Sequence, residues 1–171
     1  MDKRKKITLS DVAAELNISS TVVSMVLNGR AKKYRISEAV EQNVRRKAKE
    51  MGYQPNSLAQ GLRTGKTRTI GLILGDVSNP FFSKIASCVE KEAARYNYQV
   101  MFASSDESSE KFERAAQMFL SKQVDGLIVA PTENSEKIIM DIVKNRKPVV
   151  LIDRIVKEVP VDYVQIDNKD A

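Results

Sequence analysis

The sequence predicts an α-helical head followed by an α/β domain built on a parallel sheet. Residues 1–53 contain three amphipathic helical patterns, whereas residues 69–171 alternate short apolar runs with helical patterns, an order typical of a parallel sheet that helices cover on both faces. The charge changes near the same place: residues 1–66 carry 14 Lys and Arg against 6 Asp and Glu, and residues 67–171 carry 14 against 16. We therefore expect a helical domain at 1–53, a linking segment at 54–68 and an α/β domain at 69–171.

Two short helices joined by a tight turn open the helical domain. Thr8 and Asp11 have the spacing of a capping box at the start of a helix over 8–16. Ser19 is a favourable N-cap for a second helix over 20–28. The pair predicts a helix-turn-helix. Apolar residues recur at helical spacing on the inward faces; they are Val12, Ala13 and Leu16 in the first helix and Val22, Val23, Val26 and Leu27 in the second.

A third helix is expected over 38–51, capped by Ser37 and ended by Gly52. The second helix directs small polar side chains away from its apolar stripe, and such groups can reach base edges in a major groove about 12 Å wide. A three-helix bundle without a role in nucleic-acid binding is the alternative, and the positive charge of this part of the chain favours DNA. The outward residues of the second helix are Ser20, Thr21, Ser24, Met25 and Asn28.

The α/β part should contain five strands and three helices. The helices are expected at about 80–96, 109–122 and 135–145, among the apolar runs TIGLIL, YQVMFAS, VDGLIVA, PVVLI and DYVQI. We expect Cys88, the single cysteine, to be a buried small apolar residue in the first of these helices.

The composition argues against several classes of function. One cysteine allows no disulfide within the chain and no cysteine cluster for zinc, and the absence of histidine removes the commonest general base and metal ligand. No run approaches the roughly 18 to 20 apolar residues of a membrane span, and we expect no secretory signal. The sequence holds no glycine-rich phosphate loop and no nucleophile elbow. We therefore predict a protein that is not an enzyme and has no catalytic residues, no metal site and no cofactor.

The segments ITLSDVAAELNISSTVVSMVLNGR, RISEAV, GYQPNSLAQGLRTGKTRTIGLIL and DVSNPFF follow one another in an order and at spacings that resemble the LacI/GalR family of bacterial transcriptional regulators. The resemblance runs from Ile7 to the end of the chain. It implies a cytoplasmic, nucleoid-associated repressor that binds a palindromic double-stranded DNA operator as a homodimer and has no membrane partner. It also implies a periplasmic-binding-protein-like second domain that senses a small-molecule effector, expected to be a carbohydrate or a derivative of one.

The same resemblance implies how the head meets DNA. The helix over 20–28 would be the recognition helix, and the N-terminus of the first helix would face the DNA backbone, where its dipole favours phosphate. Residues 56–62 match a hinge helix that enters the minor groove and wedges a leucine into the central base step. Expected base contacts are Ser20, Thr21 and Met25; Ser24 and Asn28 would contact phosphates, with Thr8, Leu9 and Ser19 beside them, and the hinge would use Asn56, Ala59, Gln60 and the wedge Leu62.

Three departures from the family pattern change these expectations. Met25 stands where the family often has arginine, and methionine makes only apolar contact, so the preference for guanine should weaken at one half-site position. The loop after the recognition helix is longer by about three residues and adds Lys32, Lys33 and Arg35; phosphate contact is our prediction and plain solvation the alternative. Gly61 costs the hinge helix about 1 kcal/mol relative to alanine, so we expect this helix to form only on DNA.

The effector site is expected at the loops that follow the strands, because ligands of open α/β sheets bind beyond the carboxyl ends of the strands. By resemblance, Asn79, Phe81, Phe82 and Asp153 would line the effector cleft, and this mixture of groups suits a polyhydroxylated ligand. Three of these four residues have an alternative interpretation. Phe81 and Phe82 could be core residues, and Asp153 could cap the chain or pair with Arg154.

Members of the resembled family are substantially longer and have a second lobe, so the α/β domain is expected to be an incomplete sensor, its N-terminal lobe alone. A fragment and a natural short form both remain open. Two other classes of protein compete with a regulator. The basic head and the expected lack of a signal peptide argue against a solute-binding protein, and the absence of catalytic motifs argues against an α/β enzyme.

Overall fold

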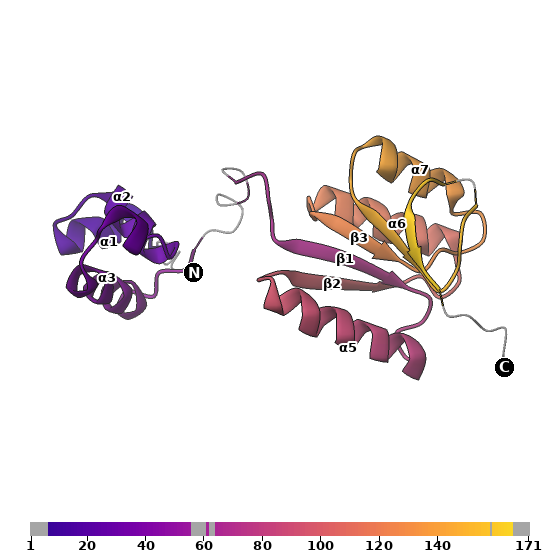
Figure 1. Cartoon of the computed structure of the whole chain (residues 1–171), viewed down its shortest axis with the longest axis horizontal. Coiled ribbons are helices and arrows are strands. Elements are labelled where there is room, and N and C mark those ends of the chain that lie inside the picture. Colours follow the sequence, from indigo (N-terminus) through magenta and orange to yellow (C-terminus); the bar gives the residue numbers. More distant parts are fainter. Residues whose placement is uncertain (1–6, 56–60, 62–63, 158, 166–171) are drawn as a thin grey trace, which may run out of the picture. The chain divides into compact units, whose positions relative to one another are not determined.

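The chain forms two compact units, residues 1–56 and 57–171. The boundary between them falls inside the segment expected to hold the hinge and linker. The computed structural model describes residues 7–55, 61, 64–157 and 159–165 (Figure 1). Among these residues, no helix is both long enough and apolar enough to cross a membrane.

The N-terminal unit consists of α1 (Leu9–Leu16), α2 (Ser20–Leu27), a 3₁₀ turn η1 (Lys32–Tyr34) and α3 (Glu38–Glu50). The three α-helices confirm the predicted ones to within one residue at each end. The 3₁₀ turn η1 was not predicted. The helices pack around one small core of fully or nearly fully buried side chains, namely Val12, Ala13, Val23, Val26, Ala31, Val44 and Ala48.

Local hydrogen bonds begin and end these helices where the sequence predicts. The Thr8 N–H donates to Asp11 Oδ2 (2.8 Å) and the Asp11 N–H donates to Thr8 Oγ1 (3.3 Å), which completes the capping box. Asn17 ends α1 in the left-handed conformation (φ 52°). The Ser19 hydroxyl oxygen accepts from Val22 N–H (3.3 Å) and starts α2. The turn between α1 and α2 is therefore fixed at both ends.

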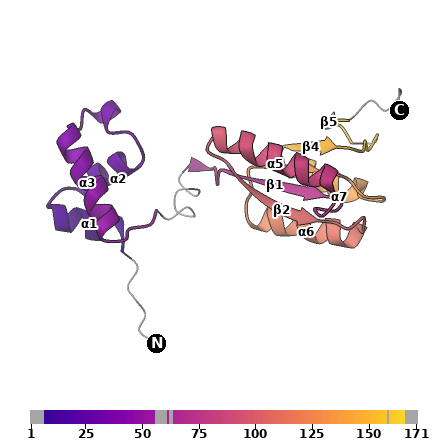
Figure 2. The same cartoon turned by 90° about the horizontal axis from the view of Figure 1, so that it is seen from below.

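The C-terminal unit is a five-stranded parallel sheet in the order β2-β1-β3-β4-β5. Figures 1 and 2 show α5 on one face of this sheet and α6 and α7 on the other. The alternation of strands and helices confirms the predicted α/β architecture. The elements are β1 (Thr69–Leu74), α5 (Pro80–Arg95), β2 (Gln99–Ser104), α6 (Ser109–Ser121), β3 (Gly126–Val129), α7 (Glu136–Lys144), β4 (Val149–Ile152) and β5 (Asp162–Val164).

Each face of the sheet has its own core. On the α6 and α7 face, Phe112 and Phe119 are fully buried against Ile73 and Leu127. Gly71 of β1 leaves room for Phe119, because a Cβ atom on Gly71 would lie 2.5 Å from Cδ2 of that ring. On the α5 face, the core contains Leu72, Leu74, Phe82, Ala86, Ala130 and Ile152.

The expectation for Cys88 is wrong, because its side chain is exposed. The buried stripe of α5 is formed by Phe82, Ala86 and Ala93, which recur at helical spacing. Cys88 lies two positions after Ala86, which turns it about 200° around the helix and away from the sheet.

Candidate functional site

The exposed face of α2 carries the residues predicted to read bases. Val23 and Val26 are completely buried, whereas Ser20 and Thr21 are exposed and Met25 is half-buried. A short helix that keeps its apolar residues on one side leaves a polar surface on the other. The structure therefore brings the three predicted base-reading residues onto the solvent-facing side of one helix.

Ser24 and Asn28, predicted to contact phosphates, hydrogen-bond to each other on the same helix. Asn28 Nδ2 donates to the Ser24 carbonyl oxygen (2.7 Å) and to Ser24 Oγ (3.2 Å). Because the Ser24 hydroxyl accepts in this contact, its own proton is available to donate to an anion. Both side chains are half-buried.

The N-terminal contact residues occupy the first turns of the two helices. Thr8 is exposed, and its hydroxyl donates to Asp11 Oδ2 (2.7 Å). Leu9 is half-buried and packs against the core of the head, while Ser19 is exposed beside the start of α2. These positions place backbone N–H groups of both helix starts at the surface, where they favour an anion.

A residue of α3 that sequence reasoning missed holds the end of α2. Arg45 Nη2 donates to the Val26 carbonyl oxygen (3.0 Å) at the C-terminus of α2. Glu41 holds the guanidinium in place, because its Oε1 accepts hydrogen bonds from Arg45 Nε (3.0 Å) and Nη2 (2.8 Å). A cation at a helix C-terminus is stabilising. The i,i+4 spacing of Glu41 and Arg45 was the available signal for the ion pair, but not for the contact with α2.

The basic loop after α2 is an ordered turn. Ala31 is 2% exposed and anchors the loop in the core of the head. The Ile36 N–H donates to the Ala31 carbonyl oxygen (3.0 Å), and Arg35 closes the turn in the left-handed conformation (φ 54°). The side chains of Lys32, Lys33 and Arg35 are exposed. Three cations are thus presented from a fixed backbone directly after α2.

Most of the predicted hinge lies outside the described residues, including Asn56, Ala59, Gln60 and Leu62. Gly61 and Thr64 are helical, and the Gly65 N–H donates to the Gly61 carbonyl oxygen (2.8 Å). Gly65 has φ 67° and ends this turn. The hinge contacts with DNA stay a prediction.

The predicted effector residues separate into exposed and buried positions. Asn79 caps α5 by accepting from the Phe81 N–H (2.9 Å). Phe81 is 36% exposed, whereas Phe82 is 7% exposed and belongs to the core on that face of the sheet. Phe82 is therefore a core residue, as the alternative interpretation proposed. The edge of its ring also approaches Gly75, directly after β1.

Asp153 follows β4 in the left-handed conformation (φ 69°). Its Oδ2 lies 3.8 Å from Nε of the neighbouring Arg154. Arg154 pairs more closely with Glu107, which raises the pKa of the guanidinium. A Cβ atom on Gly75 would lie 2.6 Å from Glu107 Oε1, so this carboxylate covers the carboxyl end of β1. Glu107 is a polar group of this edge of the sheet that the sequence did not single out.

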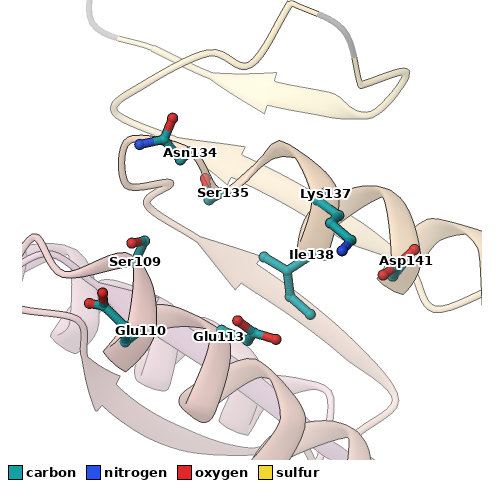
Figure 3. A pocket seen from close by; sticks show the side chains of 8 residues that line it. All are labelled: Ser109, Glu110, Glu113, Asn134, Ser135, Lys137, Ile138 and Asp141. Atoms are coloured by element: carbon teal, nitrogen blue, oxygen red, sulfur yellow. The ribbon is translucent and has the colours of Figure 1, made fainter.

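A polar cavity of about 330 Å³ lies between α6 and α7 (Figure 3). None of the four predicted effector residues lines it. Within the described part of the chain, no group of three or more His, Cys, Asp or Glu side chains could hold a metal ion. The residues lining the cavity are Ser109, Glu110, Glu113, Asn134, Ser135, Lys137, Ile138 and Asp141.

Comparison with known proteins assigns both units. Residues 8–56 match the model for bacterial regulatory proteins of the lacI family, and residues 67–171 match the model for periplasmic binding proteins and the sugar binding domain of the LacI family. Catabolite control protein A of Streptococcus mutans is 34% identical over 175 residues, which cover 100% of this chain and 50% of that protein. The chain spans about half the length of the curated relatives it matches.

Solved structures share the fold. The Lac repressor dimer bound to operator and the anti-inducer ONPF has a TM-score of 0.80 at 23% identity, over 97% of this chain and 50% of that one. The Cra regulator of Pseudomonas putida in complex with fructose 1-phosphate has a TM-score of 0.55 at 32% identity, over 60% of this chain and 38% of that one. The family models together cover both units, and the chain belongs to the LacI family of bacterial regulatory proteins.

Proposed function

We propose that this chain provides the DNA-reading head and the first sensor lobe of a transcriptional repressor that binds a palindromic operator as a homodimer. One observation carries the proposal: α2 buries Val23 and Val26 completely while Ser20 and Thr21 face solvent. A helix with this distribution can enter a major groove without giving up its core contacts. Such a protein would act in the cytoplasm, where bacterial DNA lies.

The side chains of α2 suit two kinds of contact. The hydroxyls of Ser20 and Thr21 both donate and accept, so they can pair with several base edges, while Met25 suits a thymine methyl group. Ser24 and Asn28 would bind phosphates and fix the register of the helix. Arg45 of α3 helps to hold α2 in position, because it donates a hydrogen bond to the C-terminal end of α2.

Similar proteins support this proposal. The Lac repressor structure contains a dimer bound to operator, and the Streptococcus mutans relative is a catabolite control protein. The Pseudomonas putida structure holds fructose 1-phosphate. These similarities favour a dimeric regulator that responds to a carbohydrate or a carbohydrate derivative.

Selection from a random DNA pool with the 171-residue chain tests the proposal. We expect enrichment of a two-fold symmetric site with a deformable central step, because two recognition helices and two hinges would contact it. Enrichment of single half-sites would overturn dimer binding by this chain and leave the role of α2 standing. Binding that depends on salt and not on sequence would overturn the proposal.

The basic turn after α2 gives a separate prediction. Replacing Lys33 with alanine should make the slope of log K against log salt shallower by roughly 0.9 for each protomer, about 1.8 for the dimer, because each protomer loses one phosphate contact and its released counterion. Lys49→Ala removes another exposed cation, from α3 of the same head, and should leave the slope unchanged. Equal slopes for the two variants would mean that the turn is only solvated.

The proposal also includes an effector of the sensor domain. We propose that a carbohydrate-like ligand binds at the carboxyl edge of the sheet near Asn79, Phe81 and Asp153, and that ligand and operator alter one another's affinity. A panel of sugars and sugar phosphates should contain a compound that changes operator affinity at least fivefold, the lower end of typical coupling. Asp153→Ala should reduce that change, and a panel without effect would contradict a carbohydrate effector.

A further inference from the structure

A single carboxylate holds the chain where the linker enters the sheet. Asp125 lies one residue before β3 and is half-buried. Its Oδ1 accepts from the Thr67 N–H (2.7 Å) and the Thr67 hydroxyl (3.0 Å), and its Oδ2 accepts from the Arg68 N–H (3.0 Å). Arg68 is left-handed (φ 54°), so two successive N–H groups converge on the anion, a backbone arrangement that binds anions in many proteins.

Further contacts attach Thr67, Arg68 and Asp125 to the sheet. The Asp125 N–H donates to the Thr69 carbonyl oxygen (2.7 Å), so that Asp125 both donates to and accepts from the incoming chain. The Thr67 hydroxyl also reaches the Gln123 carbonyl oxygen (2.9 Å). The guanidinium of Arg68 lies 6.0 Å from the ring centre of Tyr98, close to the start of β2.

Hydrogen bonding keeps Asp125 ionised. Burial opposes its charge, but the donors on Thr67 and Arg68 outweigh burial, so the pKa of Asp125 is lowered. The pKa of the Tyr98 phenol is raised, by burial and by its hydrogen bond to Asp125. At neutral pH the linker is therefore held by charge-assisted hydrogen bonds, which are stronger than neutral ones.

The clamp, which we define as Asp125 with Thr67 and Arg68, lies very close to the hinge. The helical turn at Gly61 and Thr64 ends at Gly65, and the Thr64 hydroxyl donates to the Lys66 carbonyl oxygen (3.0 Å). Only Gly65 and Lys66 separate that turn from the clamp. Whatever fixes Thr67 and Arg68 therefore also holds the adjoining end of the linking segment, at Gly65 and Lys66, where it joins the sensor domain.

We propose that Asp125 is a positioning residue for operator binding, which acts by fixing the course of the hinge where it joins the sensor domain. This inference rests on the proposed function, because it assigns to Asp125 a share of operator affinity. The residue contacts no DNA. Its effect is exerted through Thr67 and Arg68, and sequence-independent binding by the head does not require it.

The test compares Asp125→Asn with Asp141→Asn in the 171-residue chain. The first variant removes the anion from the clamp, and the second removes a carboxylate of α7 whose ion pair with Lys144 is at the surface (3.8 Å). In Asp125→Asn we expect the amides of Thr67 and Arg68 to exchange at least tenfold faster without DNA. We expect the ratio of operator to nonspecific DNA affinity to fall about tenfold, while Asp141→Asn changes neither quantity.

Thr67→Val is the second variant, since it removes only the hydroxyl that reaches Asp125 and Gln123. It should lower the ratio of operator to nonspecific DNA affinity about threefold and leave the melting temperature of the sensor domain unchanged. If Asp125→Asn fails to fold, this variant alone tests whether the clamp contributes to operator binding. Faster amide exchange with an unchanged affinity ratio would overturn the inference and leave a purely structural clamp. If the unmodified chain prefers no DNA site, the proposed function is wrong as well. If the unmodified chain prefers a site and the variants keep that preference, only the role of Asp125 is wrong.

Discussion

Replacing Gly71 with alanine is expected to destabilise the α/β domain by about 1–3 kcal/mol, the usual cost of overpacking a core. The new Cβ would lie 2.5 Å from Cδ2 and 2.9 Å from Cγ of Phe119. Phe119 is completely buried between α6 and the sheet and has no free space into which to turn. Urea unfolding should show a lower midpoint with an unchanged slope.

Gly126→Ala provides the matched control for Gly71→Ala. Gly126 also lies in a strand, but its nearest neighbour to a new Cβ would be the Pro148 carbonyl oxygen at 3.4 Å. We expect a change within about 0.5 kcal/mol for this variant. Equal costs for the two substitutions would show that the packing of Phe119 on Gly71 does not limit the fold.

Replacing Met25 with arginine is expected to create a preference for guanine at one position of each half-site. Arginine can donate two hydrogen bonds to guanine O6 and N7, a contact worth about 1–3 kcal/mol, which corresponds to roughly tenfold to hundredfold discrimination. Methionine at this place offers only apolar contact. Selection from a random pool should therefore give a tolerant position for the unmodified chain and a guanine for Met25→Arg.

Gln42→Arg controls for the added charge, since Gln42 is an exposed residue of α3 in the same head. It should raise overall affinity slightly and leave the selected sequence unchanged. An invariant guanine already selected by the unmodified chain, together with no change in Met25→Arg, would mean that Met25 does not face a base.

The predictable part of the fold came from local signals. Thr8, Ser19 and Ser37 begin α1, α2 and α3 because their side chains satisfy free N–H groups within the next three residues. The alternation of apolar runs with amphipathic helices fixed the order of the α/β elements. These signals depend on neighbours in the chain, so a sequence can show them.

The remaining features depend on residues that are distant in the chain. Nothing near Arg45 indicates that it reaches Val26, and nothing near Asp125 indicates that it holds Thr67 and Arg68. Phe81 and Phe82 are adjacent and chemically identical, yet only the sheet decides that Phe82 is the buried one. The polar face of α2 was predictable because its amphipathic pattern is local.

Amide chemical-shift mapping with the selected operator shows whether the exposed face of α2 reads DNA. The 19.2 kDa chain suits such a measurement when uniformly labelled with ¹⁵N. We predict that the largest changes fall on Ser20, Thr21 and Met25, with smaller changes in the basic turn at Lys32–Arg35 and little change on the outward face of α3. Changes concentrated on α3 or on the sheet domain, with α2 unaffected, would mean that α2 is not the recognition helix.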